Sequence, residues 1–167
     1  MKILRELLIV LALVAFSGNV SARASDFKIR TLNGEDVALS SYFEPGKWTM
    51  VMLWTTYCVT CRKQFRMISR FHNEHKDKDA KVIGISLDGL ALINRVRDYI
   101  LQQPMAFESG VAEIARFTRA FKEITEEDFK GTPTYLMFDP TGAMVGHAAG
   151  PMKIELAEQF IADNPPE

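Results

Sequence analysis

Hydrophobic and polar residues follow one another in short blocks that are typical of alternating strands and helices. Residues 26–43 hold two short alternating stretches on either side of Asn33-Gly34, a dipeptide that favours a hairpin turn. Residues 47–56 form a continuous apolar run, and residues 80–87 form a second one. Such runs are expected for central strands that are buried on both faces. The chain is therefore predicted to begin with a hairpin and two buried strands.

Helical periodicity appears in three segments, residues 62–76, 90–103 and 110–121. Pro104 ends the second of them, and residues 105–109 are a candidate short strand. The expected apolar faces of the three helices are Phe65, Ile68, Ser69 and His72; Leu92, Val96, Tyr99 and Ile100; and Val111, Ile114, Ala115 and Thr118.

The last part of the chain predicts a second hairpin and a final helix. Apolar segments at 134–139 and 143–150 flank a turn at Pro140-Thr141-Gly142, and residues 153–162 are amphipathic. No internal repeat or interdomain linker is visible. Strands that alternate with helices and end in a hairpin predict a three-layer α/β sandwich with a mixed sheet.

Composition is that of one soluble globular domain. The 167 residues are 47% apolar and 25% charged, which suffices for a hydrophobic core. A net charge of −1 gives no electrostatic basis for nucleic-acid binding.

The N-terminal 24 residues are predicted to be a separate targeting segment. Lys2 and Arg5 precede an apolar run, residues 7–16, and small residues follow up to Ala24. This order is typical of a cleaved signal peptide, and the run is shorter than the roughly 20 residues that span a bilayer. An uncleaved N-terminal anchor is the alternative. Either way we expect residues 25–167 to fold outside the cytoplasm, where disulfides persist.

The chain contains only two cysteines, Cys58 and Cys61. A purely structural disulfide between them would close a very short loop and would stabilise the fold by only roughly 2 kcal/mol on the chain-entropy model. Zinc needs four ligands, and His72 and His75 lie about 16 to 21 Å further along the same predicted helix. Haem attachment needs histidine directly after the second cysteine, where this chain has Arg62.

Redox chemistry fits the local context of the cysteines. Cys58 follows a predicted buried strand and lies at the start of a predicted helix, where the helix dipole favours a thiolate. Cys61 comes one turn later and can attack a mixed disulfide formed at Cys58. Gly131-Thr132-Pro133 directly precedes a predicted central strand, and a cis Thr132–Pro133 bond would explain a proline there.

Together these motifs resemble the TlpA/ResA-like exported thiol-disulfide oxidoreductases of the thioredoxin superfamily. The resemblance covers nearly all of the chain after the targeting segment. It rests on the W-x-x-x-C-x-x-C motif that begins at Trp54, on Gly131-Thr132-Pro133, and on a closing glycine, Gly150. It implies a thioredoxin-like three-layer α/β/α sandwich with an N-terminal β-hairpin and a helix-strand insertion at residues 90–110.

The resemblance also implies roles for individual residues. Cys58 would be the nucleophile and Cys61 the resolving thiol, and the two would form the redox disulfide. Client proteins would bind through transient mixed disulfides, without a bound cofactor or metal. A reductase in the bacterial periplasm, recharged by a membrane electron donor of the DsbD/CcdA type, is the expected activity. The implied substrate-binding residues are Thr132, Pro133, Trp54 and Tyr57.

Several positions depart from the family pattern. Tyr57 replaces the tryptophan that usually precedes the first cysteine, and Val59-Thr60 between the cysteines contains no proline. Met52 stands where thioredoxin has a buried acid, and Gln64 stands where ResA-like proteins have a functional glutamate. The redox potential is therefore open, and a dithiol oxidase is an alternative to a reductase.

A copper(I) chaperone is the alternative from another class. Thiolates and methionines suit Cu(I), and His147 is a candidate third ligand. Such proteins, however, generally space their cysteines by three residues. A peroxiredoxin is a weaker match, since Thr55 and Cys58 fit T-x-x-C but Val51 stands where proline is expected.

Overall fold

The computed structural model describes residues 26–166, and the predicted targeting segment at residues 1–24 lies outside them. Seven strands form one mixed sheet in the order β2-β1-β5-β4-β3-β6-β7. The strands are β1 (Lys28–Thr31), β2 (Asp36–Ala38), β3 (Trp48–Trp54), β4 (Ala80–Ser86), β5 (Glu108–Val111), β6 (Thr134–Phe138) and β7 (Met144–Ala149). The helices are α1 (Val59–His75), α2 (Ile93–Leu101), α3 (Ile114–Thr125) and α4 (Ile154–Asp163), with short 3-10 helices η2 (Leu39–Tyr42) and η3 (Leu90–Leu92).

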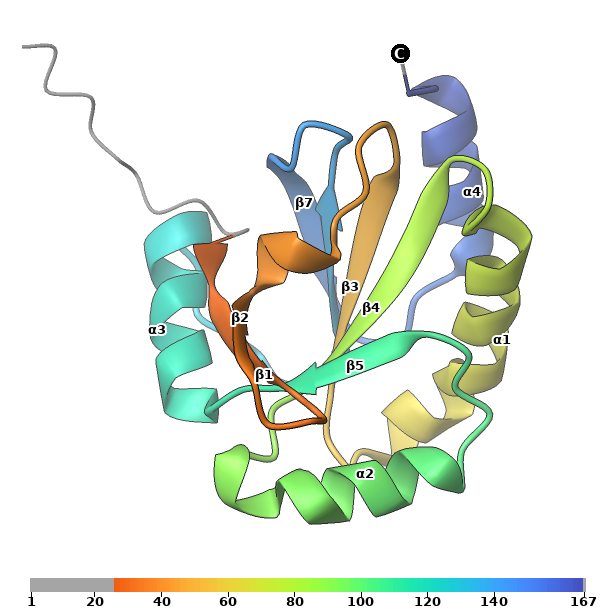
Figure 1. Cartoon of the computed structure of the whole chain (residues 1–167). Coiled ribbons are helices and arrows are strands. Elements are labelled where there is room, and N and C mark those ends of the chain that lie inside the picture. The colour runs from red at the N-terminus through yellow and green to blue at the C-terminus, as the bar shows by residue number, and fades with distance from the viewer. Residues whose placement is uncertain (1–25, 167) are drawn as a thin grey trace, which may run out of the picture.

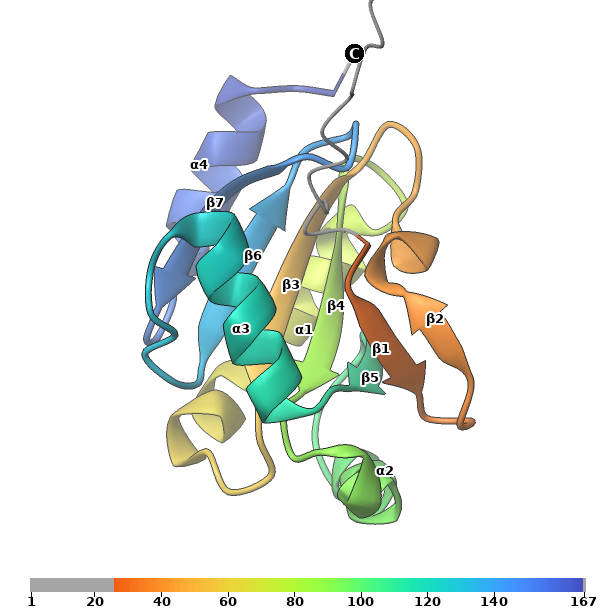
Figure 2. The ribbon, with the colours of Figure 1, turned by 90° about the vertical axis from the view of Figure 1, so that its left-hand side faces the viewer.

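Helices cover both faces of the sheet, as the predicted three-layer sandwich requires. Helices α1 and α4 lie on one face and α3 lies on the other, while α2 lies at the end of the sheet where α1 begins (Figures 1 and 2). Two apolar clusters fill the spaces between the layers, one with side chains from α1, α2 and α4 and one with side chains from α3. The thioredoxin-like fold predicted from the sequence is confirmed.

Strand β3 is an interior strand of the sheet, between β4 and β6. It pairs in parallel with β4 and antiparallel with β6, and all seven of its residues are buried. Met52 and Trp54 pack into the α1 side of the core, and Val51 and Leu53 pack into the α3 side. Because both faces are covered, six of the seven residues of the strand are apolar, with Thr49 as the exception, which explains the apolar run in the sequence.

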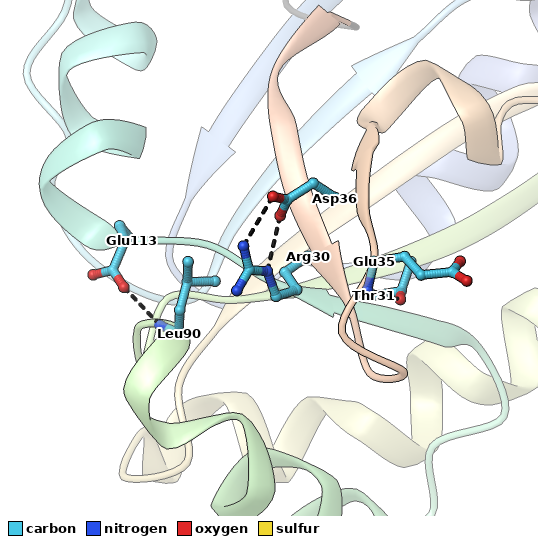
Figure 3. Close-up of polar contacts among 6 residues, drawn as sticks. All are labelled: Arg30, Thr31, Glu35, Asp36, Leu90 and Glu113. Carbon is cyan, nitrogen blue, oxygen red and sulfur yellow. Dashed lines mark hydrogen bonds and ion pairs between the residues drawn. The ribbon is translucent and has the colours of Figure 1, made fainter.

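The N-terminal hairpin forms around the predicted Asn33-Gly34 turn, where Gly34 has φ of 95°. Figure 3 shows two side-chain contacts that support it. The Arg30 guanidinium donates to both oxygens of Asp36 at 2.8 Å, and the Thr31 hydroxyl accepts from the Glu35 N–H at 3.1 Å. The ion pair is exposed, so its contribution to stability is small.

The predicted strand at residues 105–109 is misplaced. Strand β5 occupies Glu108–Val111, where Gly110 pairs with Ile85 of β4 in a parallel ladder. Gly110 is required by close packing, since a Cβ atom there would lie 2.8 Å from the Ile29 side chain. A Ser-Gly pair has little intrinsic strand propensity, so tertiary packing decides this assignment.

The third helix is also displaced, and its predicted apolar face is wrong. Because Val111 belongs to β5, α3 begins at Ile114, which is exposed. The helix instead buries Phe117 and Phe121, which pack against Phe129. In the second helix Val96 is buried as predicted, but Leu92 is exposed.

Glu44 links the loop before β3 to strand β4 and is expected to make stability depend on pH. Its carboxylate lies 2.6 Å from the Lys47 ammonium and 2.7 Å from that of Lys81. These hydrogen bonds, first to Lys47 and then to Lys81, lower the pKa of Glu44 from 4.5 to about 2. A lowered pKa in the folded state stabilises the fold above the unfolded pKa, and this stabilisation is lost as pH falls toward 2.

We therefore expect Glu44→Gln to reduce the free energy of unfolding at pH 7 by at most about 1 kcal/mol, because the side chain is partly exposed. The difference from the unmodified protein should disappear near pH 2. Urea unfolding at several pH values measures it. Glu123→Gln, at an exposed position on α3, is the matched control and should show no such pH dependence. An equal loss from Glu44→Gln at pH 7 and pH 2 would contradict the prediction.

Among residues 26–166 no helix is both long enough and apolar enough to cross a membrane.

Candidate active site

The two cysteines meet at the junction of β3 and α1. Cys58 is the N-cap of α1, and its Sγ accepts a hydrogen bond from the Cys61 N–H at 3.1 Å. The two Sγ atoms form a disulfide, with 5.2 Å between the Cα atoms. This is the predicted pairing. A sulfur at a helix N-terminus faces unpaired N–H groups and the positive end of the dipole, which favour a thiolate when the bond is reduced.

The two sulfurs differ in exposure. Cys58 is partly exposed, whereas Cys61 is completely buried in the α1 side of the core. An external thiol or disulfide therefore has access to Cys58 alone. Cys61 can react only with a group that is already bonded to Cys58.

The Gly131-Thr132-Pro133 loop lies against the disulfide. The Thr132–Pro133 peptide is cis, as predicted, and the Thr132 carbonyl oxygen lies 3.5 Å from Cys58 Sγ. A disulfide sulfur has no hydrogen to donate, so this distance is a contact in the oxidised state. The Gly150 N–H donates to the Pro133 carbonyl at 2.8 Å and connects the loop to the end of β7. Pro133 itself is buried.

The two aromatic residues predicted to bind substrate have opposite environments. Tyr57 is 69% exposed and lies directly before Cys58, where its ring is open to solvent. Trp54 is completely buried between Phe65 and Tyr99, so its predicted contact with substrate is wrong. Trp54 is the last residue of β3, and the inserted helix α2 covers it with Tyr99. It supports the site from inside the core.

Gln64 occupies a polar position one turn of α1 beyond Cys61. Its Oε1 accepts hydrogen bonds from the Tyr135 hydroxyl at 3.1 Å and from the Met152 N–H at 2.9 Å. Burial raises the pKa of Tyr135, so this hydroxyl stays protonated and remains the donor. Met52 is apolar and buried in the same core. Positions 64 and 52, where the family pattern has carboxylates, thus hold a neutral amide and a thioether.

Asp88 holds the loop that leads to Cys58, a role that the sequence did not reveal. Its carboxylate accepts from the Thr56 N–H at 2.9 Å, from the Thr56 hydroxyl at 2.7 Å and from the Ser86 hydroxyl at 2.6 Å. Thr56 lies two residues before Cys58, so this contact connects the end of β4 to the disulfide loop. The only signal in the sequence is an aspartate at the carboxyl end of a buried strand.

We expect Asp88→Asn to loosen this loop and lower the free energy of unfolding by about 1–3 kcal/mol. Asparagine offers one acceptor oxygen in place of two, and its NH₂ group would face the donors of Thr56. The rate at which iodoacetamide alkylates reduced Cys58 should change as well. Asp98→Asn, on the exposed side of α2, removes the same charge and should leave both quantities unchanged. Equal effects from the two variants would rule out a specific role for Asp88.

Among residues 26–166 no group of three or more histidine, cysteine, aspartate or glutamate side chains could hold a metal ion. His147, the candidate copper ligand, stacks edge-on against Phe121 on the α3 side of the sheet. Cys61 is buried on the α1 side. The structure therefore does not bring His147 and the two sulfurs together as a ligand set.

Comparison with known proteins agrees with this geometry. A model of the AhpC/TSA family matches residues 20–147. The chain is 22% identical over 144 residues to the thiol-disulfide oxidoreductase ResA of Bacillus thuringiensis, a match that covers 85% of this chain and 76% of that protein. It is also 22% identical over 138 residues to sporulation thiol-disulfide oxidoreductase A of Bacillus subtilis, covering 82% and 78% of the two chains.

Solved structures show the same fold. A thiol:disulfide interchange protein of the thioredoxin family from Chlorobium tepidum superposes with a TM-score of 0.67 at 20% identity, covering 84% of this chain and 94% of that chain. StoA from Bacillus subtilis superposes with a TM-score of 0.60 at 19% identity, covering 80% and 94%.

Proposed function

The chain belongs to the AhpC/TSA family of thioredoxin-like proteins, and from this premise we propose that it is a thiol-disulfide oxidoreductase that exchanges disulfides with other proteins. The observation that carries the proposal is the pairing of a partly exposed sulfur, Cys58 at the start of α1, with a buried one, Cys61. The relatives named thiol-disulfide oxidoreductases support the same activity.

The exchange proceeds in two steps that balance atoms and electrons. The Cys58 thiolate attacks a client disulfide, forming a mixed disulfide and releasing one client thiolate. Cys61 then loses its proton and attacks Cys58 Sγ, which releases the second client thiolate. Two electrons pass to the client, each client thiolate takes up a proton, and the protein is left with the Cys58–Cys61 disulfide.

Client contacts are assigned to the surface around Cys58. The Thr132 backbone, next to Cys58 Sγ, is available to hydrogen-bond an extended client segment, while Pro133 shapes the floor below it. Tyr57 offers an exposed aromatic ring beside the sulfur. Trp54 is excluded from this contact surface because it is buried.

Direction and location complete the proposal. We assign the protein to the bacterial periplasm, exported or anchored by residues 1–24, with residues 25–167 as the thioredoxin-like domain. There it acts as a reductase, and a membrane electron donor of the DsbD/CcdA type restores its dithiol. Equilibration with glutathione tests the direction, since a potential near about −270 mV indicates a reductant and one near about −120 mV an oxidant.

Replacing Cys61 with serine provides the test of the activity itself. Without the resolving thiol, mixed disulfides should accumulate on Cys58 and identify the clients by mass spectrometry. Cys61→Ser combined with Cys58→Ser is the control and should trap nothing. No trapped protein, together with stoichiometric Cu(I) binding by the unmodified chain, would favour the copper chaperone instead.

A further inference from the structure

Helix α1 carries an exposed stripe of positive charge that starts at the disulfide. The stripe consists of Arg62, Lys63, Arg66 and Arg70, all of which are exposed. Each residue of an α-helix advances about 100° around the axis, so the four side chains lie within an arc of about 100°. Glu74 is the only acidic residue of the helix. We call these four residues the basic stripe.

The basic stripe is unfavourable for the helix that bears it. Arg62, Arg66 and Arg70 follow at i, i+4 and i+8, so like charges are neighbours on one face and repel each other. No acidic residue occupies the first turn, where it would favour the helix dipole. Among residues 26–166, only Arg70 of the four has an ion-pair partner, Glu74 at 3.9 Å. A pattern that costs local stability and is compensated within the fold at Arg70 alone points to a function outside the fold.

The basic stripe begins next to the reactive cysteine. The first turn of α1, which carries Arg62, also contains Val59, which is 55% exposed and follows Cys58 directly. From there the stripe runs away from the disulfide, and Arg66 is eight residues, or about 12 Å along the helix, from Cys58. Arg66 and Arg70 line an open groove, whose far wall includes Pro104 and Met105. A protein whose disulfide reaches Cys58 would cover this surface.

The far wall of the groove is fixed against α1. The buried Ser69 hydroxyl donates to the Pro104 carbonyl at 2.6 Å and accepts from the Ala106 N–H at 2.9 Å. The surface is thus preformed. Tyr57 and Val59 are exposed beside the sulfur, and Arg66 and Arg70 line the groove together with Glu74, Gln103, Pro104 and Met105. Since the protein as a whole has a net charge of −1, the stripe is a local feature and not part of a general positive field.

We propose that the basic stripe is a docking surface for proteins with acidic residues beside the disulfide or dithiol that reacts with Cys58. The inference rests on the proposed exchange function and names the chemistry of its partner. Complementary charge mainly raises the rate of encounter and orients the partner, and salt weakens it. Selectivity for acidic partners is therefore the expected consequence.

Two disulfide peptides of the same length test this inference, one flanked by glutamates and one by lysines, with a neutral peptide as reference. The reduced protein should reduce the acidic peptide about tenfold faster than the basic one at low salt. The ratio should approach one as ionic strength rises and the screening length falls below about 5 Å. Rates are followed by acid quenching and chromatography.

Arg66→Glu and Arg66→Glu/Arg70→Glu should remove or reverse this preference while leaving the rate with the neutral peptide unchanged. These positions lie two and three turns from Cys58, and the neutral peptide reports any effect of the charge change on the reactivity of Cys58 itself. Arg119→Glu, an exposed arginine on α3 across the sheet, makes the same charge change and should preserve the preference.

The outcomes separate the two proposals. If none of the peptides is reduced, the exchange function fails. If the neutral peptide is reduced but the charged peptides react equally, or Arg119→Glu acts like Arg66→Glu, only the docking surface is refuted. Binding of the protein to vesicles with anionic lipid that is lost in Arg66→Glu/Arg70→Glu, without any peptide preference, would assign the stripe to a membrane instead and overturn the inference.

Discussion

Cys58→Ala is expected to abolish disulfide exchange, with a fall in kcat/KM toward a protein disulfide of at least about 10³-fold. Cys61 remains in this variant, but it is completely buried in the first turn of α1, so its sulfur cannot meet an external disulfide. Reduction of a disulfide-containing test protein, followed by the thiols it releases, measures the loss.

The opposite substitution provides the matched comparison. Cys61→Ala retains the exposed sulfur, so one equivalent of client should still form a mixed disulfide with Cys58, although turnover stops. Both variants remove the same covalent bond and one sulfur, so the loss of the disulfide is common to the two. Turnover by Cys58→Ala, or single-adduct formation at Cys61 in that variant, would contradict the assignment of Cys58 as the nucleophile.

The features that the sequence predicted well depend on neighbouring residues. The turn at Asn33-Gly34 and the buried run at β3 are local patterns, and each gives the same element in the structure. The cysteine pair and the proline at residue 133 are also short motifs whose chemistry is restricted to few alternatives. Local patterns are sufficient to predict these features because the local sequence preference and the tertiary packing favour the same structure at these positions.

The features that were missed depend on contacts between distant segments. The Thr56–Asp88 contact joins residues 32 apart, and the Gln64–Tyr135 contact joins residues 71 apart. No periodicity marks either pair. For the same reason β5 was misplaced, because its position is set by pairing with β4 and by the close approach of Gly110 to Ile29.

Another contact between distant segments caps the start of η3, the 3-10 helix that leads into α2. The Glu113 carboxylate accepts from the Leu90 N–H at 2.7 Å, 23 residues away, as Figure 3 shows. Gly89, with φ of 89°, makes room for it, since a Cβ atom would lie 3.1 Å from that carboxylate. The segment that carries Asp88 is thereby held from both sides, by Thr56 and by Glu113.

Trp54→Ala is expected to cause the largest loss of stability, about 3–5 kcal/mol in the free energy of unfolding. The indole is completely buried, stacks on Tyr99 with 5.8 Å between ring centroids, and meets the edge of Phe65 at 5.5 Å. Its removal would leave a cavity between β3, α1 and α2, directly beneath the disulfide loop. Urea unfolding measures the loss, and a cost below about 1 kcal/mol would show that this core collapses to fill the space.

Replacing each tryptophan by phenylalanine separates packing from hydrogen bonding. The Trp48 Nε1–H donates to the Asn164 carbonyl at 3.0 Å, whereas Trp54 Nε1 is buried without an acceptor among residues 26–166. Trp48→Phe therefore breaks a hydrogen bond, and Trp54→Phe removes an unpaired buried donor, which by itself costs about 1–3 kcal/mol. We expect Trp54→Phe to be the less destabilising variant, with an unchanged rate of disulfide exchange because the ring does not touch the client. If Trp54→Phe costs more than Trp48→Phe, the packing lost with the indole outweighs the removal of the unpaired donor, and the prediction is wrong.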